Sequence, residues 1–401
     1  MIRFFPCVAA LCLATAGAAQ DLGGRARYEG GGIVDARRGA ADLTLDLSQG
    51  VPWRAFTLVD PPRLVLDFRE VDWTGADAAA MDGSEAVERL NMGRYRRGWS
   101  RFVALLAGPM TITRAGMTVD DATGRAVLGL RLAPAGAAEM AAQSGVPHDP
   151  RWDPPPAKLI APPRSAANPR PRIVLDPGHG GIDPGAERDG HDEADLMLTF
   201  ARDLRDVLRR AGFDVVLTRD SDDFVSLEGR VALAHEAGAD LFVSLHADAI
   251  EEGIAHGATV YTLAPDASDA ASEALAERHD RDDILAGLDL SGADDRVADV
   301  LLDLARLDNA PRSRALAEHL VAGIRNAVGT VHKHPLRSAG FSVLKAADIP
   351  SVLIEVGFLS TEADLAHLQD PAWRAGMAAG IRDGIEAWEI EDGALERLRR
   401  Q

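Results

Sequence analysis

Residues 173–181 read IVLDPGHGG and decide how the second half of the chain folds. The apolar run at 173–175 predicts a buried strand, which Pro and Gly end just before His179. From there, strand and helix patterns alternate: helices are expected over 194–211 and 227–236, and strands at 215–217, 241–245 and 352–354. This alternation predicts an α/β domain over 172–401, with a mixed, mostly parallel sheet flanked by helices.

The part of the chain before this domain has a different pattern. Residues 41–47 alternate polar and apolar side chains, as a half-buried strand does, and similar short runs follow as far as residue 132. We therefore expect a small β-rich sandwich over 20–135. Ten of the 22 prolines fall within 134–171. Such a stretch holds neither a helix nor a central strand, so residues 136–171 are predicted to be a linker, with few contacts between the two domains.

The first 19 residues have the pattern of a secretory signal peptide. Arg3 precedes an apolar stretch over 4–16, and small residues follow at 17–19. This pattern predicts export to the periplasm and removal of the segment. Both cysteines of the chain lie in it, so any metal site of the mature protein must use His and carboxylate ligands. No later stretch is apolar over the length that a transmembrane helix needs.

The negative charge of the chain lies almost entirely in its second half. The formal net charge is −19, and residues 172–401 contain 23 Lys and Arg against 44 Asp and Glu. Nucleic-acid binding needs clustered cations along the phosphates, so this composition excludes nucleic acid as a partner. Residues 251–312 have 15 acidic and 5 basic residues and two amphipathic helix patterns, over 268–279 and 294–307. We expect this segment to be an insert in the domain.

Side chains with metal-binding chemistry follow the predicted strands. His179, His246 and Glu355 each come at a strand end, and Glu193 lies near the start of the first helix. Ligand sites of open α/β sheets gather at the carboxyl ends of the strands, so these side chains are expected to converge. Two imidazoles and one carboxylate are a common catalytic zinc set, and a further carboxylate, for which Glu355 is the candidate, must then move the proton. From the residues alone, a structural role for each histidine and a helix-dipole role for Glu193 remain open.

Several motifs resemble the zinc-dependent N-acetylmuramoyl-L-alanine amidases of the bacterial cell wall. They occur in the order found in that family: IVLDPGHGG at 173–181, DPGA at 183–186, LTR at 217–219, FVSLHAD at 242–248 and IEVGFLS at 354–360. The resemblance covers 172–390. It implies zinc on His179, Glu193 and His246, with Glu355 as the catalytic acid and base. It also implies the substrate, the amide bond between N-acetylmuramic acid and L-alanine in the stem peptide of peptidoglycan.

Two other parts of the chain resemble modules of the same enzymes. The sequences WRAFTL at 53–58 and PPRLVLD at 61–67 resemble the AMIN domain, which places such enzymes on peptidoglycan. A stabilising domain without a ligand is the alternative. The acidic insert resembles the regulatory segment of the family, whose helix covers the active site until a LytM-type activator removes it. Relatives usually have Glu-Asn where this chain has His279-Asp280, so both Glu277 and His279 are candidates for blocking the metal, with Glu277 preferred as a carboxylate.

Two other functions remain compatible with the sequence. A zinc peptidase or carboxypeptidase would cut elsewhere in the stem peptide with similar residues. A wall-binding scaffold without activity would need none of them. The scaffold is disfavoured because all four proposed site residues are present.

Overall fold

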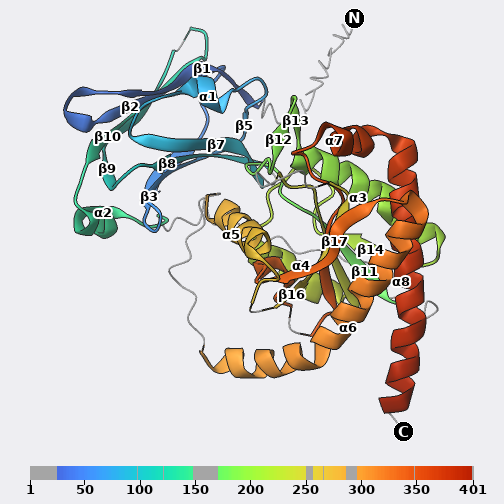
Figure 1. The fold of residues 1–401 in the computed structure, drawn as a ribbon. Helices are drawn as coiled ribbons and strands as arrows, with labels where there is room; N and C mark the ends of the chain where they lie inside the picture. The colour runs from blue at the N-terminus through green and yellow to red at the C-terminus, as the bar shows by residue number, and fades with distance from the viewer. Residues whose placement is uncertain are drawn as a thin grey trace, which may run out of the picture.

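The structure is a computed structural model that describes the chain from residue 25 onward, with gaps. The described residues are 25–96, 98–120, 122–147, 170–249, 256–264, 266–285, 296–346 and 348–399. The predicted signal peptide and most of the predicted linker lie outside these ranges. Within them, no helix has the length and apolar character needed to cross a membrane. Figure 1 shows a β-rich unit beside a larger unit of sheet and helices.

The β-rich unit confirms the pattern expected from the first part of the chain. One sheet has the strand order β5-β1-β2-β10-β9, with β6 paired to β1, and another has the order β3-β4-β8-β7. The strands of the first sheet are β1 (Ala26–Asp35), β2 (Ala41–Leu47), β5 (Val71–Asp72), β6 (Asp82–Gly83), β9 (Met110–Val119) and β10 (Ala126–Pro134). Those of the second are β3 (Trp53–Leu58), β4 (Arg63–Phe68), β7 (Val87–Arg96) and β8 (Trp99–Leu106). Short helices α1 (Ala78–Met81) and α2 (Ala137–Gln143) and a 3-10 turn (Arg37–Gly39) connect or follow them. Helix α2 lies within the predicted linker 136–171, so the expectation that this stretch holds no helix is wrong at its beginning, where Met140 is buried in the core of the β-rich unit.

Side chains of both sheets share one hydrophobic core. Leu43 of β2, Leu66 of β4, Phe102 of β8 and Leu128 of β10 belong to the same buried cluster. In β2 every second side chain is fully buried, so the alternation that predicted this strand is also what places its apolar face in the core. In β4, by contrast, every side chain is buried. A strand buried on both faces must have a second packing partner, which here is the other unit.

The larger unit is built on a mixed sheet, as predicted. Its strand order is β14-β11-β15-β18-β16-β17. The pairs β14–β11, β11–β15 and β15–β18 are parallel, whereas β16 runs antiparallel to β18. The strands are β11 (Arg172–Pro177), β14 (Asp214–Leu217), β15 (Leu241–His246), β16 (Ala258–Leu263), β17 (Val331–Ala339) and β18 (Ser351–Glu355), and a small hairpin outside the sheet consists of β12 (Glu187–Arg188) and β13 (His191–Asp192).

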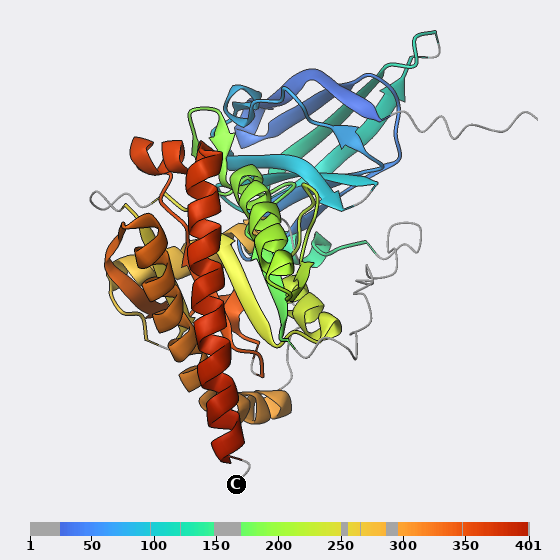
Figure 2. The same ribbon diagram turned by 90° about the vertical axis from the view of Figure 1, so that its right-hand side faces the viewer.

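Helices cover both faces of this sheet. On one face, α3 (Glu193–Arg210), α6 (Arg296–Val328) and α8 (Pro371–Arg399) pack against it, with α7 (Glu362–Gln369) beside α8 (Figure 2). On the other face lie α4 (Leu227–Ala237), α5 (Ala270–Leu285) and a 3-10 turn (Ser342–Leu344). The helix predicted over 194–211 is thus confirmed as α3, and the one over 227–236 as α4.

The acidic segment differs in detail from the expected insert. Residues 258–263, which lie inside it, form β16 and belong to the sheet. The first expected helix is α5, but the second is only the beginning of α6, which continues through Pro311 to Val328. Figure 1 shows that α6 is bent, as proline inside a helix causes. The continuation was missed because it lies beyond the acidic stretch on which the prediction rested.

Contacts also cross between the two units, contrary to the expectation drawn from the proline-rich segment. Val65 of β4 and Val103 of β8 share a buried apolar cluster with Ile182 and Phe224 of the larger unit. The proline content of the segment predicts only that the chain connecting the two units is extended. It says nothing about whether their surfaces fit together.

Candidate active site

The predicted site residues converge at the carboxyl ends of the parallel strands. Strands β11, β15 and β18 are neighbours, and His246 and Glu355 are direct partners in the register of β15 and β18. His179 follows the end of β11, and Glu193 is the first residue of α3. All four side chains are buried. The strand-end argument thus located residues that the structure brings together from four separate parts of the chain.

The Glu193 carboxylate lies between two imidazoles. Its Oε1 is 3.2 Å from His179 Nε2 and 3.0 Å from His246 Nδ1. Ligand atoms at about 2.0–2.1 Å from a tetrahedral zinc ion lie about 3.3 Å from one another, so this spacing suits such an ion. Backbone N–H groups of Ala247 and Ala186 donate to the same carboxylate at 2.8 and 3.1 Å and fix its orientation.

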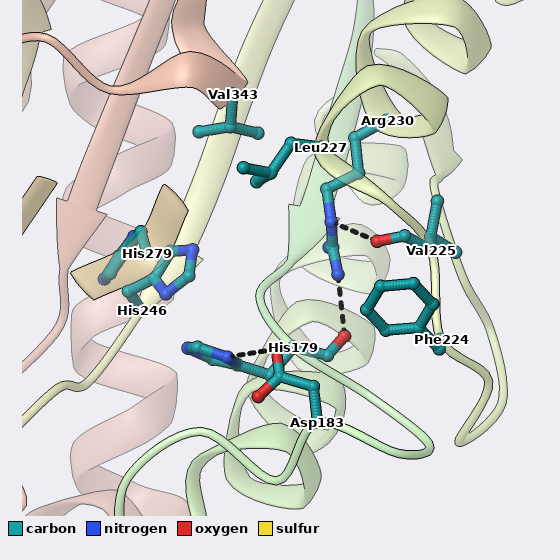
Figure 3. Close-up of a pocket in the computed structure, with 9 residues that line it drawn as sticks. All are labelled: His179, Asp183, Phe224, Val225, Leu227, Arg230, His246, His279 and Val343. Atoms are coloured by element: carbon teal, nitrogen blue, oxygen red, sulfur yellow. Dashed lines mark hydrogen bonds and ion pairs between the residues drawn. The ribbon is translucent and has the colours of Figure 1, made fainter. Parts of the chain in front are cut away.

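A third imidazole, that of His279, reaches the site from α5. One ligand atom from each of His179, His246 and His279 lies within 4.8 Å of the others, and all three residues are buried. The His279 ring centroid is 4.2 Å from that of His246, and Figure 3 shows these two rings side by side above His179. Three histidines are therefore placed to hold a metal ion.

Glu277, the preferred blocking residue in the sequence analysis, is exposed, so the structure reverses that preference. Residues two apart on a helix point about 200° apart, and the buried side of α5 carries Leu275 and His279. The choice therefore depends on the rotation of α5 about its axis. The carboxylate preference of related enzymes does not show which side of α5 faces the site.

The cavity at the site leaves little free space. It is lined by His179, Asp183, His246 and His279, among others, and its volume is about 20 Å³ (Figure 3). A cavity of about 10–15 Å³ measured in this way holds one water molecule. With α5 in place, the site is thus too small for a peptide bond and the groups that flank it.

Glycines near His179 are required by close packing. A β-carbon at Gly178 would lie 2.6 Å from both ring nitrogens of His246, and one at Gly185 would lie 2.6 Å from His179 Cδ2. His179 itself has a left-handed backbone conformation, with φ of 57°. Non-glycine residues adopt this conformation rarely, and such strain is concentrated at functional sites. Glycine at positions 178 and 185 thus allows the loop to pack closely against the imidazoles of His246 and His179.

A second layer of polar residues orients His179. The Nδ1 of His179 lies 2.7 Å from Asp183 Oδ2, which leaves Nε2 to face Glu193. Arg230 donates to the carbonyl oxygen of His179 at 2.8 Å and to Asp176 Oδ1 at 2.7 Å (Figure 3 shows the first bond). Carboxylates behind a ligating histidine fix its tautomer and raise its basicity. Asp183 was quoted in the sequence analysis without a role, although its position four residues after His179 was the available signal.

Burial and neighbouring charges set the protonation of the imidazoles. Burial alone lowers the pKa of His179, but the carboxylates of Asp183 and Glu193 outweigh it and raise that pKa well above its usual range. Burial and the nearby His279 lower the pKa of His246 to about 4, so this imidazole is neutral. Burial alone raises the pKa of Glu193, but His179 and His246 hold it well below its usual range. An ionised carboxylate between imidazoles favours a cation at this place.

Glu355 has the opposite character. Burial, together with Glu193 and Asp248, raises the pKa of the Glu355 carboxyl well above its usual range. Its Oε2 accepts the backbone N–H of Asp248 at 3.0 Å, while Oε1 has no hydrogen-bond partner among the described residues. The surroundings of Glu355 therefore favour its protonated form, whereas those of Glu193 favour the carboxylate.

The pattern of unpaired buried atoms fits a metal ion. Among the described residues around the site, His279 Nδ1 and Glu355 Oε1 have no hydrogen-bond partner, and three other buried atoms have ion-pair contacts only: His179 Nε2 lies 3.2 Å from Glu193 Oε1, and His279 Nε2 lies 3.4 Å from Asp248 Oδ2. Leaving a buried polar atom unpaired costs about 1–3 kcal/mol, so several in one cluster indicate a missing partner. The available donors are imidazole nitrogens and carboxylate oxygens, which are ligands typical of zinc. The residues present therefore fit the ion that the family resemblance implies.

Comparison with known proteins agrees with this chemistry. A family model described as N-acetylmuramoyl-L-alanine amidase matches residues 173–387, more than half of the chain. The chain belongs to the N-acetylmuramoyl-L-alanine amidase family. The predicted family is thereby confirmed for the larger unit. Because the match begins at residue 173, the resemblance of the β-rich unit to an AMIN domain stays a prediction.

Individual relatives show how far the similarity extends. The chain is 40% identical to the N-acetylmuramoyl-L-alanine amidase AmiA of Escherichia coli (strain K12) over 215 residues, which cover 53% of this chain and 74% of that relative. It is 36% identical to AmiC of Neisseria meningitidis serogroup B over 230 residues, covering 57% and 55% of the two chains. Among solved structures, the amidase AmiC2 of Nostoc punctiforme has 28% identity, with a TM-score of 0.41 over 54% of this chain and 96% of that one.

Proposed function

We propose that this protein hydrolyses the amide bond between N-acetylmuramic acid and the L-alanine of the peptidoglycan stem peptide. The observation that carries the proposal is the position of Glu193 Oε1 at 3.0–3.2 Å from two imidazoles, with Glu355 paired to His246 in the strand register, in a chain of this family. His179, Glu193 and His246 are the proposed zinc ligands. When bound, zinc polarises the carbonyl of the scissile amide and lowers the pKa of water.

The roles of the chain's own residues follow from their surroundings. The Glu355 carboxyl is buried and its Oε1 has no hydrogen-bond partner among the described residues, so it is suited to take the proton of the attacking water and pass it to the leaving amine of L-alanine. Asp183 orients His179 through Nδ1, and the N–H groups of Ala247 and Ala186 orient Glu193. These contacts would orient the proposed metal ligands His179 and Glu193 before the ion binds, which reduces the entropy cost of ordering them on binding.

We further propose that the protein is self-inhibited by α5. A catalytic zinc site has three protein ligands and an open position, and a fourth protein ligand closes it. His279 is placed to be that ligand. The helix is held by further polar contacts, because Arg278 Nη1 donates to Asp248 Oδ1 at 2.7 Å and Ser342 Oγ donates to Asp280 Oδ2 at 2.9 Å. A LytM-type activator would have to break these contacts.

The remaining parts of the proposal concern location. Residues 1–19 are proposed to be a signal peptide that directs the protein to the periplasm, and residues 20–135 an AMIN-like domain that contacts peptidoglycan. Residues 136–171 would link this domain to the catalytic domain at 172–401. Cell separation and wall turnover are the processes that such an activity serves.

The test is digestion of purified sacculi by the zinc-loaded protein carrying His279→Ala, with and without a chelator. An amidase releases intact stem peptides that begin with L-alanine and leaves glycan strands free of peptide. Mass analysis of the released peptides shows where the cut lies. Shortened stem peptides would point to a peptidase, and release that is unaffected by the chelator would refute the zinc site.

A further inference from the structure

The loop that follows His179 is in contact with the β-rich unit. The N–H of Ile182 donates to the backbone carbonyl oxygen of Arg94 in β7 at 3.1 Å. The side-chain amide of Asn91, also in β7, donates to the carbonyl oxygen of Ile182 at 3.4 Å. Both polar groups of the Ile182 backbone are thus satisfied by the other unit.

The two backbones approach so closely that only glycine fits between them. A β-carbon at Gly93 of β7 would lie 2.7 Å from the carbonyl carbon of Gly181 and would overlap its oxygen. A β-carbon at Gly181 would lie 2.7 Å from the Phe224 nitrogen and would overlap the carbonyl oxygen of Arg94. Backbone contact at this distance between distant parts of a chain defines their relative position tightly, because neither side can give way as a flexible side chain would.

Apolar side chains close the interface around this contact. Ile182 and Phe224 pack on Val65 and Val103 in the second sheet of the β-rich unit, and all four are buried. The Tyr95 ring stacks on Phe224, with centroids 6.0 Å apart and planes 19° apart. Burying apolar surface contributes roughly 25 cal/mol per Å², so the cluster stabilises the docked arrangement.

Residues of the larger unit support the same loop from its other side. Arg230 donates to the carbonyl oxygen of His179, and Arg219 Nη2 donates to that of Gly178 at 2.7 Å. The Gly180 N–H donates to Asp183 O at 2.7 Å. The loop is therefore held between two arginines of its own unit and strand β7 of the other.

We propose that β7 is a positioning element of the active site: by holding Gly181 and Ile182 it keeps His179 in its left-handed, metal-binding conformation. The inference rests on the proposed role of His179 as a zinc ligand. It makes the β-rich unit part of the catalytic machinery, in addition to any contact that this unit has with the wall. Loss of the docked arrangement should weaken zinc binding without unfolding either unit.

Gly93→Ala in the full-length mature protein tests this proposal. The φ of Gly93 is compatible with L-residues, so within the β-rich unit alone alanine is not strained; its β-carbon meets Gly181. The matched control is Gly116→Ala in β9, where a β-carbon meets nothing within 4 Å. Two quantities are measured: amide hydrogen exchange at Ile182, and the dissociation constant for zinc by competition with a chromogenic chelator.

We expect Gly93→Ala to raise exchange at Ile182 by about tenfold or more and to weaken zinc binding by roughly tenfold, as loss of support behind a metal ligand does. Gly116→Ala should change neither. Zinc affinity equal to that of the wild type, despite faster exchange, would overturn the positioning role, and unchanged exchange would overturn the contact itself. If circular dichroism shows that Gly93→Ala does not fold, the double variant Asn91→Ala/Tyr95→Ala takes its place with the same criteria. Absence of zinc binding in the wild type would refute the proposed function, whereas exchange at Ile182 would still report on the contact.

Discussion

Arg278→Ala should activate the protein in the absence of any activator. Arg278 lies next to His279, the proposed blocking residue, on α5 and donates to Asp248 Oδ1 at 2.7 Å and to the carbonyl oxygen of Ala249. The Asp248 side chain is 5% exposed and that of Arg278 is 38% exposed. A hydrogen bond to a charged group contributes about 1.5–3 kcal/mol when buried, and exposure of the arginine reduces this to about 1–2 kcal/mol. Since 1.4 kcal/mol is a factor of ten, the population of undocked α5, and with it basal hydrolysis, should rise roughly 5- to 30-fold.

Glu277→Ala is the matched control for this prediction. Glu277 is the preceding residue of the same helix, is exposed, and also becomes alanine, so both variants favour the helix equally. The assay is dye release from labelled sacculi at equal protein concentration and equal zinc occupancy. Arg278→Ala should exceed the wild type and Glu277→Ala should equal it. If the two variants have the same basal rate, α5 does not restrain the site through this contact, and docking of the helix is not what limits hydrolysis.

Three further predictions concern the ligands and the β-rich unit. His246→Ala should remove zinc and abolish hydrolysis, whereas Glu355→Gln should keep zinc and slow hydrolysis by about 10²-fold or more; metal analysis beside the rate checks this division, and zinc loss in Glu355→Gln would contradict it. Asp183→Asn should weaken zinc binding by about 10- to 100-fold, measured by chelator competition, because it removes the carboxylate behind His179. Burial alone raises the pKa of Asp67, but Arg101 and Arg54 hold it below its usual range. Its stabilising contribution is thus present above the unfolded pKa of about 3.9 and lost as the pH falls through the lower folded pKa. The difference in unfolding free energy between wild type and Asp67→Asn should shrink between pH 7 and pH 3 in denaturant titrations, and a difference independent of pH would refute the pairing.

The sequence predicted the catalytic half well because its signals are local. Short β-branched runs ending in a polar residue place that residue at the carboxyl edge of a parallel sheet, which is how His179, His246 and Glu355 were found. The residue of α5 that reaches the site was harder to predict. Glu277 and His279 differ only in which side of α5 they occupy, and the side that packs inward is set by Leu275 and the sheet beneath it. A weakly amphipathic, charged helix does not reveal that rotation in its own sequence.

The contact between the units could not be predicted from the sequence. Gly93 and Gly181 are about ninety residues apart in the chain; the positive φ of Gly181 explains its glycine locally, whereas nothing in β7 itself requires glycine at Gly93. Their common reason, the close approach of two backbones, is visible only when both units are placed. The structure shows the same contact in the continuous burial of β4, because a strand at the surface of an isolated domain would have one exposed face.

Under the proposed self-inhibition, activation has to move α5 and leave β7 in place. Helix α5 fills the site from one side through His279, whereas β7 supports it from another through Gly181 and Ile182. Phe224 lies between them, since it lines the cavity at His179 and also stacks on Tyr95 of β7. An activator that separated the two units would therefore remove support from the ligand that hydrolysis needs. One that draws away α5 alone breaks the contacts of the half-exposed Arg278 and Asp280 and a small apolar patch that includes Leu275. The polar attachment of α5 and the rigid backbone attachment of β7 thus suit opposite tasks: the first can be released, and the second must hold.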